Sequence, residues 1–321
     1  METSKGSDMH KVIGIDIGGT SVKAGLFTAE GALEAAASMP TGALVGERAF
    51  ADVAGMLFGL LREHGAQPSD VVGVGFDVPG PVDAGGNVGF LANIELDVDG
   101  LKAAMRKAFP QANLAFVNDA NAAAVGEYWQ GAGRELPSFA LVALGTGVGA
   151  GVIANGRLVS GAFGTGGEIG HLTVVRDEPR ACGCGGHGHL EQYASALGVV
   201  RAYREACARR GATPVELAGP TDTLAVFQAH RAGDEAAREA VSRMCDALGF
   251  AMAQVSAVVD PAAFLIGGGV GGGFDLFADE LRAAFRTYCM PPCADARIIP
   301  AALGNAAALY GSAYLALAQA E

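Results

Sequence analysis

Short apolar segments alternate with longer amphipathic ones along the chain, and glycine-rich turns separate many of them. Two β-branched segments within 12–28 surround a glycine turn, which predicts a strand, a tight turn and a second strand. At about 45–64, apolar residues recur with a period of about 3.6, as in an amphipathic helix. The continuous apolar run at 71–78 is typical of a strand buried on both faces. The other elements predicted in this half are a strand near 32–38, a helix at 101–109, a strand at 113–118 and a helix at 120–130.

The pattern of strand, Gly/Thr turn and strand begins again at 138–161, which indicates a second half built like the first. Residues 161–193 are rich in Gly, Cys and His with little periodicity, and residues 194–258 are mostly helical. A strand, a glycine turn, a helix and a strand follow at 262–299, and a last helix at 304–319 closes the chain. This alternation predicts an α/β fold. In the helix at 234–259, the stripe expected in the core or in a subunit interface comprises Val241, Met244, Leu248, Ala251, Val255 and Val258.

The length of 321 residues is usual for two domains. We expect a smaller N-terminal domain at 1–120 and a larger C-terminal domain at 121–303, with the helix at about 304–321 packing back on the first domain. The chain is 50% hydrophobic and 17% charged, so it can bury a core and differs from disordered proteins. Its net charge of −12, with five lysines and no basic run, argues against nucleic-acid and membrane-surface partners.

The first residues are polar, and no apolar stretch reaches the ~18 residues of a membrane span. We therefore expect neither a secretory signal nor a transmembrane helix. The six cysteines are scattered except for Cys182 and Cys184, which stand two positions apart. This usage indicates a reduced, cytoplasmic protein with one candidate metal loop.

Two glycine–threonine turns are candidate phosphate cradles. In IGIDIGGTSVKAG (13–25), the glycines let the backbone approach a ligand, and the aspartate at the strand end could face a Mg²⁺ ion. LGTGVGAG (144–151) repeats the arrangement in the second half. Either turn alone could be an ordinary glycine-rich hairpin, but the pair suggests two turns that hold one polyphosphate from opposite sides. The expected cofactor contacts are Asp16, Gly18, Gly19, Thr20 and Lys23 at the first turn, and Gly145, Thr146 and Gly147 at the second.

A third glycine cluster, IGGGVGGGF (266–274), follows a predicted strand and precedes a helix. It fits the G-x-G-x-x-G pattern of dinucleotide-binding folds, but the next strand, ARIIPA, ends without the acid that those folds need ~20 residues on. A contact with the nucleoside side of a nucleotide therefore fits better than dinucleotide binding. The expected contacts are Gly267, Gly268 and Gly269.

Asn118 and Asp119 stand where a predicted strand passes into a helix, which is the usual place for sites in α/β sheets. A carboxylate here could accept a hydroxyl proton while the oxygen attacks phosphorus. The alternative is that one of the two residues only caps the helix.

The segments GTGGEIGH (164–171) and CGCGGHGHLEQYAS (182–195) contain thiols and imidazoles at high density. Cys182, Cys184 and His171, with either His189 or His187, have the number and type of ligands of a tetrahedral zinc site. A flexible glycine loop with incidental thiols is the alternative. Two carboxylates, Glu168 and Glu191, lie just outside these ligands.

Taken in order, DIGGTSVKAG, PGPVD, VNDANAAAVGE, LGTGVGAG, GGEIGH, the CGCG loop and IGGGV resemble the ROK family of sugar kinases, within the actin-like ATPase superfamily. The resemblance covers the chain beyond about its first ten residues and is greatest to the bacterial glucokinase branch. It implies two actin-like (ribonuclease H-like) α/β domains with a cleft between them. It also implies ATP, Mg²⁺ and phosphoryl transfer to the 6-hydroxyl of a hexose, with glucose the first expectation.

By the same resemblance, Asp119 is the catalytic base, and His189 replaces the last cysteine of the family's C-x-C-G-x-x-G-C-x-E loop, which favours it over His187 as a zinc ligand. His171 would both bind zinc and face the sugar. The expected sugar contacts are Asn93, Asn118, Asp119, Glu168, His171 and Glu191.

Other members of the family leave alternatives open. The chain could be a kinase for fructose, mannose, allose or N-acetylmannosamine. A sugar-sensing regulator would carry a helix-turn-helix ahead of the first motif, where only about ten residues stand here, so we expect none. Polyphosphate could replace ATP as donor, although the low basic content argues against it. Family habit and alanine-rich helices suggest a homodimer or homotetramer.

Overall fold

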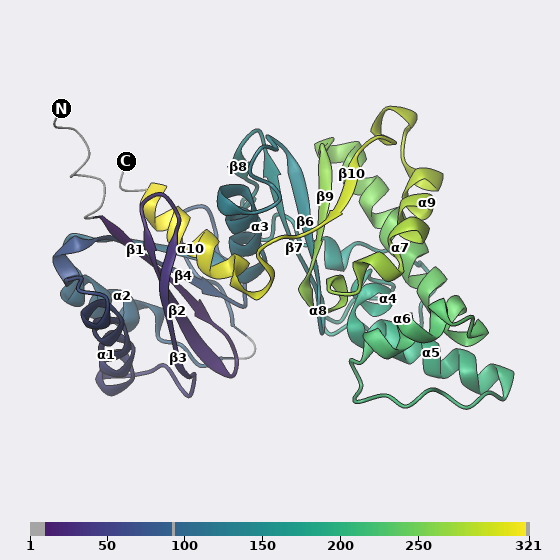
Figure 1. Cartoon of the computed structure of the whole chain (residues 1–321), viewed down its shortest axis with the longest axis horizontal. Coiled ribbons are helices and arrows are strands. Elements are labelled where there is room, and N and C mark those ends of the chain that lie inside the picture. The colour runs from purple at the N-terminus through teal and green to yellow at the C-terminus, as the bar shows by residue number, and fades with distance from the viewer. Residues whose placement is uncertain (1–9, 92–93, 319–321) are drawn as a thin grey trace. The chain divides into compact units, whose positions relative to one another are not determined.

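The structure is a computed structural model that describes residues 10–91 and 94–318. These residues form two compact units, and each unit is built on a five-stranded sheet (Figure 1). Unit 1 comprises Met1–Glu135, Leu158–Gly166 and Asn305–Glu321, and unit 2 comprises Leu136–Arg157 and Gly167–Gly304.

The sheet of unit 1 has the strand order β3-β2-β1-β4-β5. The first three strands form an antiparallel meander, whereas β4 runs parallel to β1 and β5 runs parallel to β4. The strands are β1 (Lys11–Ile17), β2 (Ser21–Thr28), β3 (Leu33–Pro40), β4 (Val71–Val78) and β5 (Asn113–Asn118). The helices are α1 (Glu47–Glu63), α2 (Val98–Ala108), α3 (Asp119–Gln130) and α10 (Ala307–Ala318).

The two faces of this sheet are covered differently. Apolar residues of α1 and α2 pack on one face in a cluster that includes Leu57, Leu101 and Phe76. The other face lies against α10, and at the glycines the approach is so close that a Cβ atom on Gly75 would overlap the main chain of Ser312. Glycines in β1 and β4 therefore permit the close approach of α10 to the sheet.

The sheet of unit 2 has the strand order β10-β9-β6-β7-β8. Strand β6 pairs antiparallel with β7 and parallel with β9, and β9 pairs parallel with β10. The strands are β6 (Phe139–Leu144), β7 (Val148–Ala154), β8 (Arg157–Leu158), β9 (Ala263–Gly267) and β10 (Arg297–Pro300). The α-helices are α4 (Glu191–Ala194), α5 (Ala196–Arg210), α6 (Thr223–Arg231), α7 (Glu235–Val259), α8 (Gly268–Gly271) and α9 (Ala278–Tyr288). The 3₁₀-helices of the chain are η2 (Pro68–Asp70), η3 (Ile169–His171), η4 (Phe274–Leu276), η5 (Pro291–Cys293) and η6 (Gly304–Ala306).

The stripe predicted along the long helix is largely the core of unit 2. Met244 and Leu248 of α7 are fully buried with the other apolar positions of the stripe. Val258 is the exception, since it lies in the last turn of α7 and is 86% exposed. The stripe was expected in the core or in a subunit interface; for Val258 the core is wrong, and a subunit interface stays a prediction.

The expected domains were 1–120 and 121–303, whereas the first boundary between the compact units lies between Glu135 and Leu136. Helix α3 stays with unit 1 because it packs along α10, where a Cβ on Gly126 would overlap the carbonyl oxygen of Ala307. The segment 158–166 also belongs to unit 1, and the two units are nearly equal in length.

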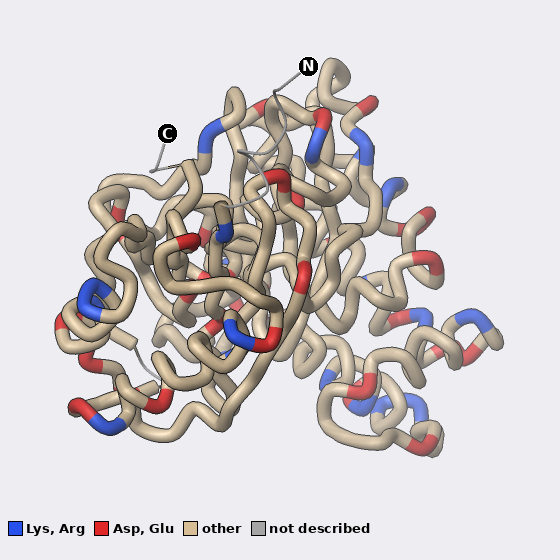
Figure 2. Tube along the Cα trace, turned by 60° about the vertical axis from the view of Figure 1, so that its left-hand side comes forward, with Lys and Arg blue, Asp and Glu red and all other residues tan. Residues whose placement is uncertain are grey.

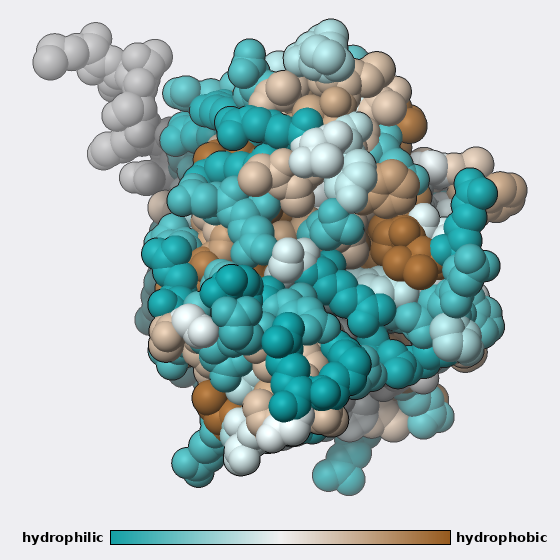
Figure 3. Space-filling model, turned by 90° about the vertical axis from the view of Figure 1, so that its right-hand side faces the viewer, coloured by the Kyte–Doolittle hydropathy of each residue, from teal (hydrophilic) through white to brown (hydrophobic). Residues whose placement is uncertain are grey.

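Charged residues of both signs are distributed along the trace (Figure 2). Lys and Arg positions alternate with Asp and Glu positions rather than gathering in one stripe. On the face drawn in Figure 3, hydrophobic residues lie in small separate spots between hydrophilic ones. Among the described residues, none of the helices has both the length and the apolar character needed to cross a membrane.

Candidate functional site

The parallel strands of unit 1 bring three aspartates to one edge of the sheet. Asp16 on β1 stands in register with Asp77 on β4, and Asp119 directly follows β5. Asp16 also faces Lys23 on β2, whose Nζ atom lies 2.9 Å from Asp16 Oδ2. The carboxyl ends of parallel strands are where ligands bind in open α/β sheets, so this acidic edge is the candidate site of unit 1.

Asp77 is the member of this edge that sequence analysis missed. It is fully buried, and neither of its carboxylate oxygens has a hydrogen-bond donor among the described residues. Burial, together with the negative charges of Asp16 and Asp119, raises the pKa of Asp77 well above its usual value. A carboxyl group in such a place is either protonated or faces a cation. The signal that could have found it was an acidic residue near the carboxyl end of an otherwise apolar strand.

The two polar residues at the start of α3 have different roles. Asn118 caps the helix, because its Oδ1 accepts the Asn121 N–H at 3.0 Å. Its Nδ2 donates to the Gly80 carbonyl at 3.2 Å, so both ends of the side chain already have partners. Asp119 is the first residue of the helix and is exposed, with Oδ1 accepting the Ala120 N–H at 2.8 Å. Its carboxylate is therefore accessible to a substrate and is stabilised by the N-terminus of the helix.

The first Gly/Thr turn joins β1 to β2 beside this edge. The Gly18 N–H donates to the Ser21 carbonyl at 3.1 Å, and Thr41 Oγ1 donates to the Gly18 carbonyl at 2.6 Å. These bonds hold the turn, while Gly19 and Thr20 stay exposed at its tip. The tip can therefore offer backbone N–H groups to an anion next to Lys23.

In unit 2, the other two glycine turns lie against each other. Gly145 N–H donates to the Gly147 carbonyl at 2.9 Å, and Thr146 is exposed at the tip between them. Gly268 has φ of 78° and a Cβ there would overlap the backbone of Leu144. The turn at Gly267–Gly269 thus packs on the strand that leads into the turn at Gly145–Gly147, as expected of one shared nucleotide site.

A cavity of about 250 Å³ opens beside the turn at Gly267–Gly269. Its walls combine the apolar ring of Phe274 with the carboxylate of Asp275, a mixture that suits a ring system with polar edges. Neither residue was predicted as a site residue from the sequence, since only their nearness to the glycine run marks them. The other lining residues are Ile266, Gly271, Gly272, Pro300, Ala301 and Gly304.

The metal candidates of unit 2 form a cluster. One ligand atom from each of His171, Cys182, Cys184 and His189 lies within 4.8 Å of the others. Cys184 Sγ is 3.3 Å from His189 Nδ1, close to the ~3.5 Å that separates sulfur and nitrogen ligands on tetrahedral zinc. His187 lies outside the cluster, with its Nδ1 3.0 Å from the Glu178 carbonyl oxygen. Two thiols and two imidazoles are a donor set that fits Zn²⁺.

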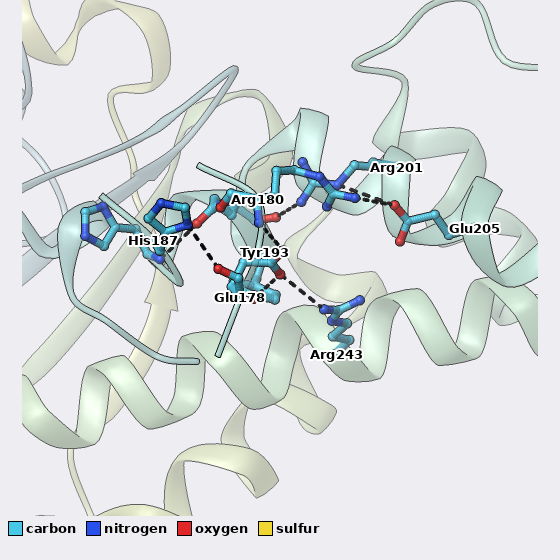
Figure 4. Close-up of polar contacts among 9 residues, drawn as sticks. Glu178, Arg180, His187, Tyr193, Arg201, Glu205 and Arg243 are labelled. Atoms are coloured by element: carbon cyan, nitrogen blue, oxygen red, sulfur yellow. Dashed lines mark hydrogen bonds and ion pairs between the residues drawn. The ribbon is translucent and has the colours of Figure 1, made fainter. Parts of the chain in front are cut away.

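Partly buried and exposed polar contacts hold the loop of this cluster on the helices of unit 2 (Figure 4). Tyr193 Oη donates to Glu178 at 2.6 Å, and Arg243 of α7 lies 3.9 Å from the same carboxylate. Burial and this hydrogen bond raise the pKa of Tyr193 to about 12, and the same bond lowers the pKa of Glu178. Gln192 accepts the His189 N–H at 3.1 Å, which attaches the metal loop to α4. None of these contacts has a sequence signal, because each joins ordinary residue types across the fold.

The expected sugar contacts of unit 2 lie around this cluster. Glu168 Oε2 is 4.0 Å from His171 Nε2, and Glu191 Oε2 accepts the Val148 N–H at 3.1 Å. Glu191 therefore reaches the turn at Gly145–Gly147 as well as the metal loop. Asn93, the remaining expected sugar contact, lies outside the described residues.

The chain matches the model of the ROK family over residues 12–319. It is similar to the glucokinase of Halalkalibacterium halodurans, with 34% identity over 318 residues that cover 94% of each chain. It is also similar to the N-acetyl-D-glucosamine kinase of Pectobacterium atrosepticum, with 30% identity over 95% of this chain and 98% of that one. Among solved structures, it is similar to a ROK family glucokinase from Streptomyces griseus in complex with glucose and AMPPNP, with a TM-score of 0.75 and 32% identity over 95% of this chain and 99% of that chain. These matches confirm the predicted α/β fold class.

Proposed function

The chain belongs to the ROK family, and on this premise we propose that it transfers the γ-phosphoryl group of ATP to the 6-hydroxyl of glucose. Its fold is that of the actin-like sugar kinases of this family. The observation that carries the proposal is the exposed carboxylate of Asp119, held at the start of α3 on the same sheet edge as Asp16 and Lys23.

Asp119 is proposed as the general base. The sugar oxygen forms a bond to the γ-phosphorus, the bond from that phosphorus to the bridging oxygen of ADP breaks, and the hydroxyl proton passes to the Asp119 carboxylate. A carboxylate is a weak base, but it suffices where the proton moves late in a loose transition state. A base of this kind contributes roughly 10²- to 10⁴-fold to the rate.

The polyphosphate would be held by backbone N–H groups of the turns at Gly18–Thr20 and Gly145–Gly147, with Gly267–Gly269 and the cavity beside them on the nucleoside side. The acidic edge supplies the hard oxygen donors that Mg²⁺ prefers, and the buried Asp77 carboxyl without a donor fits a cation nearby. Asp16, paired with Lys23, is the residue that would hold Mg²⁺ there. When bound, Mg²⁺ neutralises charge that develops on the phosphates.

For the sugar, we propose contacts from Asn118, Asp119, Glu168, His171 and Glu191, together with Asn93. The cluster of His171, Cys182, Cys184 and His189 would hold a structural Zn²⁺, which supplies no chemistry to the transfer itself. Its effect would be to orient the loop that carries three of the proposed sugar contacts. None of the six cysteines, which all lie among the described residues, is in a disulfide, and this supports action in a reducing compartment such as the cytoplasm. A homodimer or homotetramer remains the expected assembly.

The test is release of ADP from MgATP with a panel of hexoses, measured as kcat/KM for each sugar. Glucose should give the highest value among glucose, mannose, fructose, allose, N-acetylmannosamine and N-acetylglucosamine. The similarity to an N-acetyl-D-glucosamine kinase supports a second candidate, in which an N-acetylhexosamine is the substrate. A higher kcat/KM with that sugar would replace glucose, and no turnover with any sugar would overturn the proposed kinase.

A further inference from the structure

Glu191 connects the metal cluster of unit 2 to the turn at Gly145–Gly147, and we propose that it positions this turn to bind the phosphates of ATP. Its Oε2 atom accepts the N–H of Val148, the residue that ends the turn, at 3.1 Å. Its Oε1 atom lies 3.7 Å from Sγ of Cys182 in the metal cluster. Glu191 begins α4 only two positions after His189, so the cluster also fixes its backbone. The inference rests on the proposed function, in which the turn at Gly145–Gly147 binds phosphates of ATP.

Other contacts show that the turn is shaped by the elements around the metal loop. A Cβ atom on Gly147 would overlap Glu191 Oε2, so any side chain there would displace the carboxylate from the turn. A Cβ on Gly170, which precedes His171 in η3, would overlap the Val148 carbonyl oxygen. The N–H of Ala196, the first residue of α5, donates to the Gly145 carbonyl at 2.8 Å. The base of the turn is therefore contacted by η3, α4 and the start of α5, while Thr146 at its tip is exposed.

A carboxylate is a poor direct ligand for phosphate, because the two charges repel each other. With Oε2 bonded to the Val148 N–H, Glu191 instead fixes the backbone from which the turn presents its own N–H groups. Positioning the turn is a different role from contacting the sugar, and substitution of Glu191 should weaken the binding of a different ligand in each case. A sugar contact affects sugar affinity, whereas a positioning residue affects nucleotide affinity even when no sugar is present.

The experiment measures the Kd of AMPPNP with Mg²⁺ by isothermal titration calorimetry, in the absence of sugar and on the metal-loaded full chain. Glu191→Ala removes the acceptor for Val148 N–H, and it should weaken nucleotide binding about tenfold or more, as expected for a lost bond to a charged acceptor. Glu191→Gln retains an acceptor oxygen and should stay within about threefold of the wild type. Glu216→Ala, at an exposed acidic position in the loop before α6, is the matched control and should bind nucleotide like the wild type.

Removal of the metal by a chelator should weaken nucleotide binding in the wild type and have less effect in Glu191→Ala. Nucleotide binding by Glu191→Ala equal to that of the wild type, with only glucose binding reduced, would overturn the inference and leave the kinase intact. A wild-type chain that binds no nucleotide would instead overturn the proposed function on which the inference rests. Circular dichroism of each variant shows whether it is folded. If Glu191→Ala is not folded, Glu191→Met takes its place, because methionine has a similar length but no acceptor oxygen for the Val148 N–H, and the same loss of nucleotide affinity is expected.

Discussion

Replacing Gly311 by alanine should destabilise unit 1 and slow catalysis. A Cβ atom at Gly311 in α10 would lie 2.5 Å from the carbonyl carbon of Ala122 and 2.8 Å from the nitrogen of Gly126, both in α3. These are main-chain atoms, so the clash is relieved only if the two helices move apart. Overpacking against a well-packed site costs up to about 3 kcal/mol, and the helical preference of alanine over glycine returns about 1 kcal/mol. The net loss of about 2 kcal/mol corresponds to a fall in Tm of roughly 4–8 °C for a unit of this length.

The matched control is Gly55→Ala in α1, where a Cβ atom would meet no other atom within 4 Å. This variant gains the helical preference without the clash, so its stability should rise by about 0.5–1 kcal/mol. Both variants and the wild type are compared by differential scanning calorimetry, and kcat is measured at a temperature at which all are folded. Asp119 begins α3, so kcat should fall in Gly311→Ala and stay unchanged in Gly55→Ala. A Tm for Gly311→Ala at or above that of the wild type would refute the packing argument.

Three further predictions concern the buried groups and the metal cluster. The pKa of Asp77 in the folded state is raised above 3.8, so folding takes up a proton and the stability of the wild type falls as pH rises above about 4. Asp77→Asn has no carboxyl group to titrate, so the Tm of this variant minus the Tm of the wild type should increase from pH 5 to pH 8. A difference in Tm that does not vary with pH would contradict this. Tyr193→Phe removes the 2.6 Å bond to Glu178 and should lower the free energy of unfolding by roughly 1.5–3 kcal/mol in urea titrations, whereas an unchanged midpoint would show that the bond contributes nothing. His189→Ala should lose zinc and His187→Ala should keep one zinc per chain in metal analysis, and the reverse result would assign the fourth ligand to His187.

The order and type of the elements could be predicted because their patterns are long and local. The run at 71–78 became β4 with its predicted bounds, and the helix expected at 120–130 became α3 with one residue more. The final helix could be placed near 304–319 from its composition, but its approach to the sheet depends on glycines far away in the sequence.

Candidate site residues could be predicted where reactive residue types stand close together in the sequence. They could not be predicted where only the tertiary structure brings them together. An acidic residue near the end of an apolar strand marks Asp77 in the sequence, but only the register of β1 and β4 places it beside Asp16. Spacing also could not choose between His187 and His189. The fold separates them, since His187 contacts the Glu178 carbonyl and His189 lies in the metal cluster.

The most direct test of the proposed activity is phosphorus NMR of equimolar MgATP and glucose with the wild type and with Asp119→Asn. With the wild type, the signal of glucose 6-phosphate should grow as that of the γ-phosphate of ATP declines. With Asp119→Asn the rate should fall by at least about 100-fold, while the Kd for glucose stays within a few-fold. Failure of the wild type to form the sugar phosphate, or turnover by Asp119→Asn close to that of the wild type, would contradict the account.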